Sequence, residues 1–337
     1  MGKKGMMIRD SIELKSFAKI NLSLEVTGRR PDGYHNIRSF MQGIDLYDVI
    51  KITQCPQNGT KYNLPHCTID EVDVYLCTDA KTIPVDMSNL AFKGIKAVLD
   101  ETGSVDPETV LLVELRKMLP VAAGIAGGSG NAAVCMLGLN ALLGDPLSLR
   151  ELMTIGTKVG ADVPFSLMMN ASLNRQVLAG TDAYEGLRGL DEAKASAWVS
   201  GIGEIVDPAD PVPRFVVMAN PGIPVSTKAA YEAIDSINAA GNRKPCGEDK
   251  LYINDFELYT LRDYPEAARL KAVMDREIGA DVVLMSGSGP TMVAYYTDQQ
   301  KALVGFDRLK EIADRENNWR VWLTRTGEEQ PAIATDR

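Results

Sequence analysis

A glycine-rich stretch at residues 120–133 contains the residue types best suited to chemistry. It reads Pro-Val-Ala-Ala-Gly-Ile-Ala-Gly-Gly-Ser-Gly-Asn-Ala-Ala and consists almost wholly of small residues. Glycines let the backbone approach a ligand closely, and a following helix adds its positive N-terminal end. These features favour a cradle for an anion, typically a phosphate. The stretch is not a P-loop, since no Gly-Lys-Ser/Thr ends it. A tight turn with Ser129 as a plain helix cap is the alternative.

Three further segments contain candidate groups. A second glycine loop, Met285–Thr291, lies between two expected strands. It either forms a simple hairpin connection or uses its glycines to bring the backbone close to a ligand or to the first loop. Asp162 lies between small residues and an apolar stretch, where burying an unpaired carboxylate is costly, and taken alone it is expected to cap or brace a turn. Lys19 interrupts a strand pattern and either points to solvent or faces Asp162, in which case each ion offsets the burial of the other.

The elements that must position these residues follow an irregular order of strands and helices, which predicts an α+β fold. Strands are expected at residues 20–26, 49–53, 72–77, 110–115, 215–220, 282–285 and 292–296. Helices are expected at residues 89–103, 131–143, 226–239, 265–278 and 301–316. We interpret residues 170–196 as an inserted loop or hairpin close to a domain boundary. The predicted domains are residues 10–170 and 171–330.

The amino-acid composition limits the functional classes to which the protein can belong. The net charge of −9 over 337 residues argues against a sequence-independent grip on nucleic acid, which needs a basic face. Five cysteines without a C-x-x-C pair are typical of reduced thiols, and their spacing fits no common zinc site. The sequence contains no apolar run of signal-peptide or membrane-spanning length, so a cytoplasmic protein without a membrane partner is expected.

The order of these segments resembles that of the GHMP kinases. Glycine loops and a Gly-Ala-Asp-Val-Pro segment are typical of the whole family, whereas Arg-Arg-Pro-Asp-Gly-Tyr-His at residues 29–35 is typical of the branch that phosphorylates a cytidine-diphosphate-linked methylerythritol. The resemblance extends in order over residues 12–296. Its segments are Ala18–Leu24, Thr27–His35, Asp45–Asp48, Asn89–Leu90, residues 120–133, Gly160–Phe165, Gly201–Glu204, Val225–Thr227, Asn254–Asp255 and Met285–Thr291.

The resemblance implies a two-domain GHMP fold with the active site in the cleft between the domains. It implies an ATP-dependent kinase with Mg²⁺, acting on the 2-hydroxyl of that small-molecule substrate in the non-mevalonate route to isoprenoid precursors. Asp162 would be the catalytic base and Lys19 would keep it ionised. The residues expected to bind ATP are Pro120, Ala122, Ala123, Gly124, Ile125, Ala126, Gly127, Gly128, Ser129, Gly130 and Asn131.

The same resemblance assigns the cytidine end of the substrate to Tyr34 and His35, with Asn21 as a further polar contact in the pocket. A tyrosine ring stacks on a pyrimidine, and an imidazole hydrogen-bonds its edge. The second glycine loop contributes Gly287, Ser288 and Gly289. No residue is assigned as a metal ligand, and both a monomer and a homodimer stay open.

The first loop departs from the usual family pattern Gly-Ala-Gly-Leu-Gly-Gly-Gly-Ser-Ser-Asp-Ala-Ala. Ala126 replaces a glycine, Gly130 a serine and Asn131 an aspartate, so one hydroxyl and one negative charge are lost. Since the backbone donors survive, we expect ATP binding to survive as well. Two alternatives remain: another GHMP kinase of the homoserine or mevalonate type, and a non-catalytic nucleotide-binding paralogue.

Overall fold

The computed structural model describes residues 10–56, 62–103, 109–121, 123–181, 184–241, 249–316 and 318–326. The chain forms two compact units that alternate along the sequence. Unit 1 comprises Met1–Ala18, Leu46–Val121 and Ala126–Ala195, and unit 2 comprises Lys19–Asp45, Ala122–Ile125 and Ser196–Arg337.

The strands of unit 1 are organised around the second half of a long strand, β3. This half pairs antiparallel with β6, which is parallel to β5, and β5 is antiparallel to β4. Strand β1 also pairs with β3. Apolar side chains such as Ile50 and Ile52 alternate with Val49 and Lys51 and are buried. The bounds are β1 (Ser11–Asn21), β3 (His35–Pro56), β4 (His66–Ile69), β5 (Val72–Thr78) and β6 (Thr109–Arg116).

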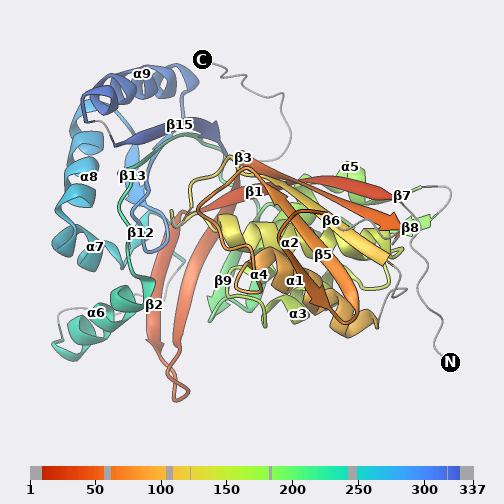
Figure 1. Cartoon of the computed structure of the whole chain (residues 1–337). Helices are drawn as coiled ribbons and strands as arrows, with labels where there is room; N and C mark the ends of the chain where they lie inside the picture. Colours follow the sequence, from red (N-terminus) through yellow and green to blue (C-terminus); the bar gives the residue numbers. More distant parts are fainter. Residues whose placement is uncertain are drawn as a thin grey trace. The chain divides into compact units, whose positions relative to one another are not determined.

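Helices of unit 1 pack against one another and against these strands (Figure 1). Small residues allow the close approach: a Cβ on Gly94 would lie 2.6 Å from the Ala132 carbonyl oxygen, and one on Gly138 would lie 3.0 Å from Ile52. The Asn89 side chain caps α1, as the sequence predicts. The bounds are α1 (Leu90–Thr102), α2 (Gly127–Leu142), α3 (Leu149–Gly156) and α4 (Val163–Leu173).

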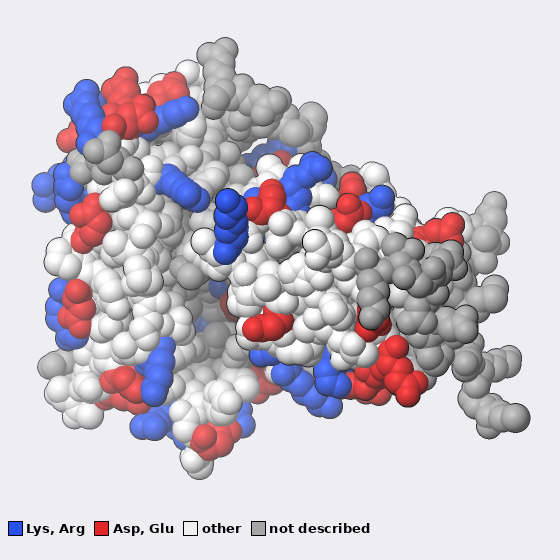
Figure 2. All heavy atoms as spheres, viewed as in Figure 1, with Lys and Arg blue, Asp and Glu red and all other residues white. Residues whose placement is uncertain are grey.

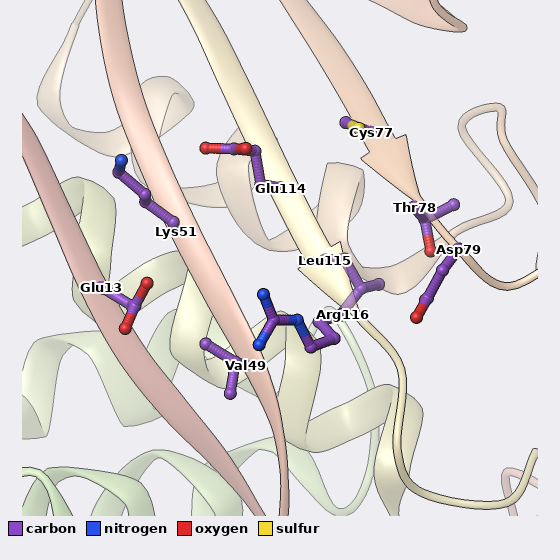
Figure 3. A pocket seen from close by; sticks show the side chains of 9 residues that line it. All are labelled: Glu13, Val49, Lys51, Cys77, Thr78, Asp79, Glu114, Leu115 and Arg116. Atoms are coloured by element: carbon purple, nitrogen blue, oxygen red, sulfur yellow. The ribbon is translucent and has the colours of Figure 1, made fainter.

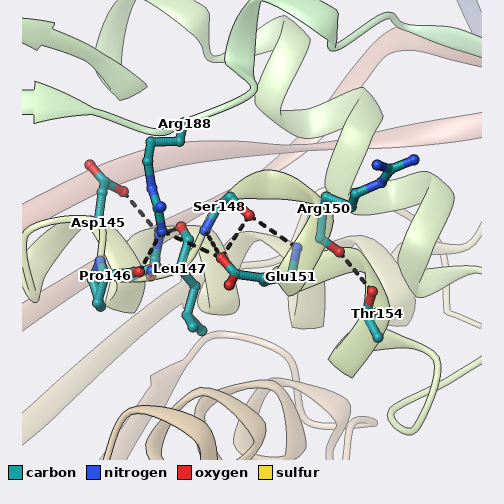
Figure 4. A network of polar contacts seen from close by, with 9 residues as sticks. Asp145, Pro146, Leu147, Ser148, Arg150, Glu151, Thr154 and Arg188 are labelled. Atoms are coloured by element: carbon teal, nitrogen blue, oxygen red, sulfur yellow. Dashed lines mark hydrogen bonds and ion pairs between the residues drawn. The ribbon is translucent and has the colours of Figure 1, made fainter.

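The segment predicted as an inserted loop or hairpin contains the end of α4, a short helix α5 (Arg175–Leu178), a 3₁₀ turn at Leu190–Glu192 and one hairpin. The hairpin is formed by β7 (Ala179–Thr181) and β8 (Tyr184–Gly186). Arg188 holds the segment to α3, because its guanidinium donates to the Pro146 carbonyl at 2.8 Å and contacts Glu151 at 3.4 Å (Figure 4). Glu151 also completes a capping box with Ser148 at the start of α3.

Unit 2 contains two groups of strands. In the first, β2 (Ser23–Arg29) and β9 (Ser196–Gly201) pair antiparallel with the first half of β3, while β10 (Ile205–Pro208) pairs with β9 and β12 (Ile253–Asn254) with β2. The second is a sheet in the order β13-β14-β11-β15. Its strands are β11 (Phe215–Asn220), β13 (Val282–Met285), β14 (Met292–Tyr296) and β15 (Arg320–Arg325).

Helices of unit 2 supply the other side of its hydrophobic core. Ala230 and Ile234 of α6, Leu270 of α8 and Leu309 of α9 are buried together with Val217 of β11. The bounds are α6 (Thr227–Ala239), α7 (Glu257–Asp263), α8 (Pro265–Glu277) and α9 (Gln299–Glu316).

The structure corrects two predicted elements. The predicted strand at residues 20–26 is divided at Leu22 between β1 and β2, and the helix predicted from Asn131 begins at Gly127. The predicted limit at residues 170 and 171 falls inside α4, and unit 1 continues to Ala195. The assignment of residues 10–170 and 171–330 to two kinase domains stays a prediction.

Charged side chains of both signs are interspersed on the surface face that Figure 2 shows. Among the helices of the described residues, none combines the length and apolar composition needed to cross a membrane.

Candidate functional site

In unit 1, α2 begins directly within the second half of the first glycine loop. Ala126 occupies the N-cap with φ of 56°, in the left-handed region that favours glycine, and its side chain makes no cap hydrogen bond. Ser129 lies within the first helical turn, so the plain-cap interpretation of Ser129 is wrong. Gly128 is exposed. Since the first N–H groups of a helix have no partner inside it, this exposed turn is suited to an anion.

The first half of the same loop, in unit 2, contacts the second glycine loop. A Cβ on Gly124 would lie 2.5 Å from the Ser286 carbonyl oxygen, and one on Gly287 would lie 2.9 Å from the Gly124 carbonyl oxygen. The Ser286 hydroxyl donates to that Gly124 oxygen at 3.1 Å. Of the roles open for these glycines, the structure shows the contact between loops. Ala122 lies outside the described residues.

Further polar contacts hold the second loop. The Ser288 hydroxyl lies 2.7 Å from that of Thr227, and the Ser288 carbonyl accepts from Thr260 at 3.2 Å. Asn254 donates to the carbonyls of Met285 and Gly287 at 2.7 and 2.9 Å. The loop is therefore tied to several elements of unit 2.

Lys19 of unit 2 is buried, with 3% of its surface exposed. Its ammonium donates to Asn21 Oδ1 at 2.8 Å, and the same oxygen accepts the Gly287 N–H at 3.0 Å. Asn21 Nδ2 donates to Ser39 at 2.8 Å. Asn21 thus joins Lys19 to the second glycine loop, and its contact with a substrate stays a prediction.

Asp162 of unit 1 occupies the N-cap of α4 but makes no side-chain cap hydrogen bond. Pro164 favours the start of a helix at this point, since its missing N–H is not needed in the first turn. The half-buried carboxylate is therefore not used to cap its own helix. Lys19 belongs to the other unit, and its pairing with Asp162 stays a prediction.

Tyr34 and His35, both in unit 2, lie at the turn between β2 and β3. The turn is closed by the Arg30 N–H, which donates to the Tyr34 carbonyl at 2.7 Å. Tyr34 is 62% exposed. The His35 ring stacks on Tyr231 at 4.6 Å between centroids, and its Nε2 lies 2.8 Å from Asp235 Oδ1. One aromatic ring is thus presented to solvent, while the next is fixed against α6.

Two family models match the chain. The GHMP kinase N-terminal domain matches residues 89–170, which include α2 and Asp162, and the GHMP kinase C-terminal domain matches residues 226–314. The chain belongs to the GHMP kinase family.

Relatives of this GHMP kinase are similar over nearly their full lengths. The 4-diphosphocytidyl-2-C-methyl-D-erythritol kinase of Lachnoclostridium phytofermentans is 33% identical over 314 residues, covering 89% of this chain and 93% of the relative. The enzyme of the same name from Geobacillus kaustophilus is 34% identical over 316 residues, covering 90% and 94%. A crystal structure of 4-(cytidine 5'-diphospho)-2C-methyl-D-erythritol kinase matches with a TM-score of 0.65 and 25% identity, over 94% of this chain and 100% of that one.

One polar cluster of the GHMP kinase did not emerge from the sequence as a site. Asp48 is fully buried in unit 1, where its Oδ1 accepts the N–H groups of Met118 and Leu119 at 2.8 Å each. Its Oδ2 accepts a hydrogen bond from the Lys117 ammonium. Asn131, predicted as an ATP contact, lies beside the same carboxylate. The sequence signal for Asp48 was its place in the Asp45–Asp48 segment, whereas nothing singled out Lys117.

A separate hollow of about 350 Å³ lies on the strand face of unit 1 that carries Val49 and Lys51 (Figure 3). Lys51 is the register partner of Glu114, and Cys77 pairs with Glu114 on its other side. This polar hollow contains none of the predicted site residues of the GHMP kinase. Its lining residues are Glu13, Val49, Lys51, Cys77, Thr78, Asp79, Glu114, Leu115 and Arg116.

Proposed function

We propose that this chain transfers the γ-phosphate of ATP to the 2-hydroxyl of 4-diphosphocytidyl-2-C-methyl-D-erythritol, in the non-mevalonate route to isoprenoid precursors. The observation that carries the proposal is the similarity, over about nine-tenths of the chain, to kinases named for this one substrate. The exposed Tyr34 beside the fixed His35 supports it, because a nucleobase needs a ring to stack on and a polar edge to pair with.

ATP binds with its phosphates at the first glycine loop. The first turn of α2, in which Gly128 is exposed, contributes backbone N–H groups and the positive end of the helix dipole. Neither contribution depends on a particular side chain, so the Gly130 and Asn131 departures leave both in place. The contacts between Gly124 and the second loop fix the backbone that precedes this turn.

Asp162 accepts the proton of the substrate hydroxyl, whose oxygen then attacks the γ-phosphorus in line, while the bond from that phosphorus to the bridging oxygen breaks and ADP leaves. Lys19 keeps the carboxylate ionised and offsets negative charge on the transferred group. In phosphoryl transfer, positioning and charge stabilisation account for most of the catalysis, so one proton acceptor and one cation are a sufficient set of side chains. A positioned base contributes about 10²–10⁴-fold.

Tyr34 stacks on the cytosine, and His35 binds its polar edge. The neutral imidazole has one donor and one acceptor nitrogen. If Nε2 donates to Asp235, which lies 2.8 Å away, Nδ1 is the acceptor. Asp235 and the Tyr231 ring would then fix both the tautomer and the plane of His35.

Mg²⁺ is expected as the partner of ATP, where it neutralises triphosphate charge. Among the described residues no group of three or more His, Cys, Asp or Glu side chains could hold a metal ion. Mg²⁺ in nucleotide sites is bound largely by phosphates and water. Mg²⁺ is therefore expected to be held by the phosphates of ATP.

A direct assay tests the proposal. The purified protein is incubated with ATP, Mg²⁺ and 4-diphosphocytidyl-2-C-methyl-D-erythritol, and in parallel with mevalonate and with homoserine; ADP release and the ³¹P spectrum of the product are measured. We expect ADP and a new phosphomonoester only with the cytidine substrate. Turnover of mevalonate or homoserine alone would assign the protein to another GHMP activity. ATP binding without turnover of any alcohol would indicate a binding protein.

A further inference from the structure

The imidazole of His35 has one nitrogen bound by the protein and one that is available to a ligand. Its Nε2 lies 2.8 Å from Asp235 Oδ1, and the side chain is 11% exposed. Within the described part of the chain, no hydrogen bond involves the other nitrogen, Nδ1. Both residues belong to unit 2. The chemical character of Nδ1 therefore depends on what Asp235 does at Nε2.

Asp235 can only accept at this contact. An ionised carboxylate has no proton to donate. Arg29 lies beside the other oxygen of the same carboxylate, with its guanidinium nitrogen 3.3 Å from Oδ2, and offsets the negative charge. Nε2 of a neutral His35 must therefore carry the ring proton, and Nδ1 is left as an acceptor.

Helix α6 also fixes the plane of the His35 ring. Tyr231 and Asp235 are four residues apart on this helix, so they lie on the same face of it. The Tyr231 ring stacks on the imidazole at 4.6 Å between centroids with 17° between the planes. Tyr231 is itself packed edge-on against Phe256 at 4.9 Å. One helix thus sets both the orientation of His35 and the position of its proton.

Cytosine and uracil differ in the group that they carry at ring position 4. Cytosine has an amino group there, which is its only hydrogen-bond donor, whereas uracil has a carbonyl oxygen, as thymine does. An acceptor at Nδ1 can pair with the amino group of cytosine. Against uracil it would meet a second acceptor, and both groups would lose their hydrogen bonds with water without gaining a partner. The tautomer of His35 therefore decides which base is favoured.

We propose that Asp235 is a positioning residue that makes the site select cytosine over uracil, by holding His35 in the tautomer whose Nδ1 accepts from the cytosine amino group. The inference rests on the proposed function, because it places the pyrimidine at Tyr34 and His35. It extends that function by assigning base specificity to a residue of α6, outside the turn that contacts the base.

NMR spectroscopy of the imidazole ¹⁵N nuclei measures the tautomer directly. The chain contains only two histidines, so His66→Gln leaves His35 as the single signal. At about pH 8, where an ordinary histidine is neutral, we expect the Nε2–H tautomer in this otherwise wild-type background. In Asp235→Asn the amide should turn its oxygen toward Arg29 and its amino group toward the imidazole, which moves the proton to Nδ1. An Nδ1–H tautomer or an imidazolium before the Asp235 exchange would overturn the proposal.

Calorimetric binding of CDP and UDP tests the specificity. The two nucleotides have the same sugar and diphosphate, so the ratio of their affinities isolates the base. We expect the wild type to bind CDP about 10-fold or more tightly than UDP. Asp235→Asn should lower this ratio about 10-fold or more. The control Glu232→Gln removes an exposed carboxylate from the same helix and should keep the wild-type ratio.

Equal affinities of the wild type for CDP and UDP, or an unchanged ratio in Asp235→Asn, would refute the role of Asp235 in base selection. An equal loss of both affinities with a lowered melting temperature would also refute it, because a residue that only supports the fold acts on both nucleotides alike. A wild type that binds neither nucleotide would refute it as well. These measurements need no turnover, so a protein that binds CDP selectively but transfers no phosphate would contradict the proposed function and leave this inference standing.

Discussion

The position of Asp162 leads to a test of its proposed function as the catalytic base. It stands at the N-cap of α4, where its side chain makes no cap hydrogen bond, and it lies in the segment matched by the GHMP kinase N-terminal model. We expect Asp162→Asn to lower kcat by about 10²-fold or more, since an amide cannot take the substrate proton, while ATP affinity stays near normal. Steady-state kinetics and ATP calorimetry measure both quantities.

The exposed Asp191 of the same unit provides a matched control, and Asp191→Asn should behave as the wild type. A kcat for Asp162→Asn above about a tenth of the wild-type value would contradict the base assignment.

Tyr34 is exposed, whereas the other Phe, Tyr and Trp side chains whose burial the structure describes are buried or half-buried, and this favours a ligand-binding role. We expect Tyr34→Ala to raise the KM for the cytidine substrate about 10-fold or more, because stacking a base on an aromatic ring contributes roughly 1–3 kcal/mol. Tyr34→Phe keeps the ring and should remain close to the wild type, and the KM for ATP should not change in either variant. Equal effects on both substrates would instead assign Tyr34 to the fold.

Residue types alone predict part of this site. The glycines, Asp162 and Lys19 are visible in the sequence because they interrupt otherwise regular patterns, whereas Tyr34 is assigned through the resemblance to the family. The contacts of the buried Asp48 with Lys117 and Asn131 are not visible, since these residues lie far apart in the chain. From the sequence Asn131 counts as a lost charge, whereas the structure places its amide group within hydrogen-bond distance of the Asp48 carboxylate.

At the scale of elements, α7 is attached to the second glycine loop by the carboxylate of Glu257, whose pKa is raised. Glu257 of α7 accepts the Met285 N–H at 2.7 Å, and Met285 begins that loop. Burial raises the pKa of Glu257 above its ordinary value of 4.5, and the nearby Lys271 opposes the rise. The contact therefore becomes sensitive to mildly acidic pH.

The sign of this sensitivity can be tested with Glu257→Gln. Between pH 4.5 and the raised folded-state pKa, the folded protein binds more protons at Glu257 than the unfolded chain, so this residue makes stability fall as pH rises through that window. The variant keeps an acceptor for Met285 and loses the titration. Its free energy of unfolding minus that of the wild type should increase from pH 4 to pH 6 in urea titrations. A constant or decreasing difference would contradict the shift.

Local signals predict elements best where a cap or turn marks the end. The bounds of β11, β13 and β14 agree with expectation, and α6 follows its predicted Ser226 cap. Helix α4 was not predicted, because it is buried on all sides and shows no apolar stripe. Helix α2 begins before Asn131, in a run of glycines whose low helix propensity places the predicted start too late.

At the scale of the whole molecule, Cys135 reports global unfolding. It is buried in α2, and burial raises the pKa of its thiol to about 12. At pH 8 only about one thiol in ten thousand would be ionised in the folded protein, so a thiol reagent should react mainly after unfolding.

To measure this, the other cysteines are replaced by serine and the labelling rate of Cys135 is followed against urea concentration. We expect the rate to rise in parallel with the unfolding transition measured by circular dichroism. A variant that retains only the exposed Cys77 should label rapidly without urea. Fast native labelling of Cys135 would show that α2 opens independently of global unfolding.

The alternation of the two units along the chain has a consequence for protein synthesis. All segments of unit 1 have been translated once Ala195 is added, whereas unit 2 needs both Lys19–Asp45 and everything from Ser196 onward. Leu24 and Val26 of β2 belong to a core whose other members begin at Phe215. Chains elongate from the N-terminus and domains generally fold as units. The nascent chain therefore presents an apolar hairpin without its core while unit 1 is already able to fold, and the hairpin is covered only after residues 196–337 have been synthesised.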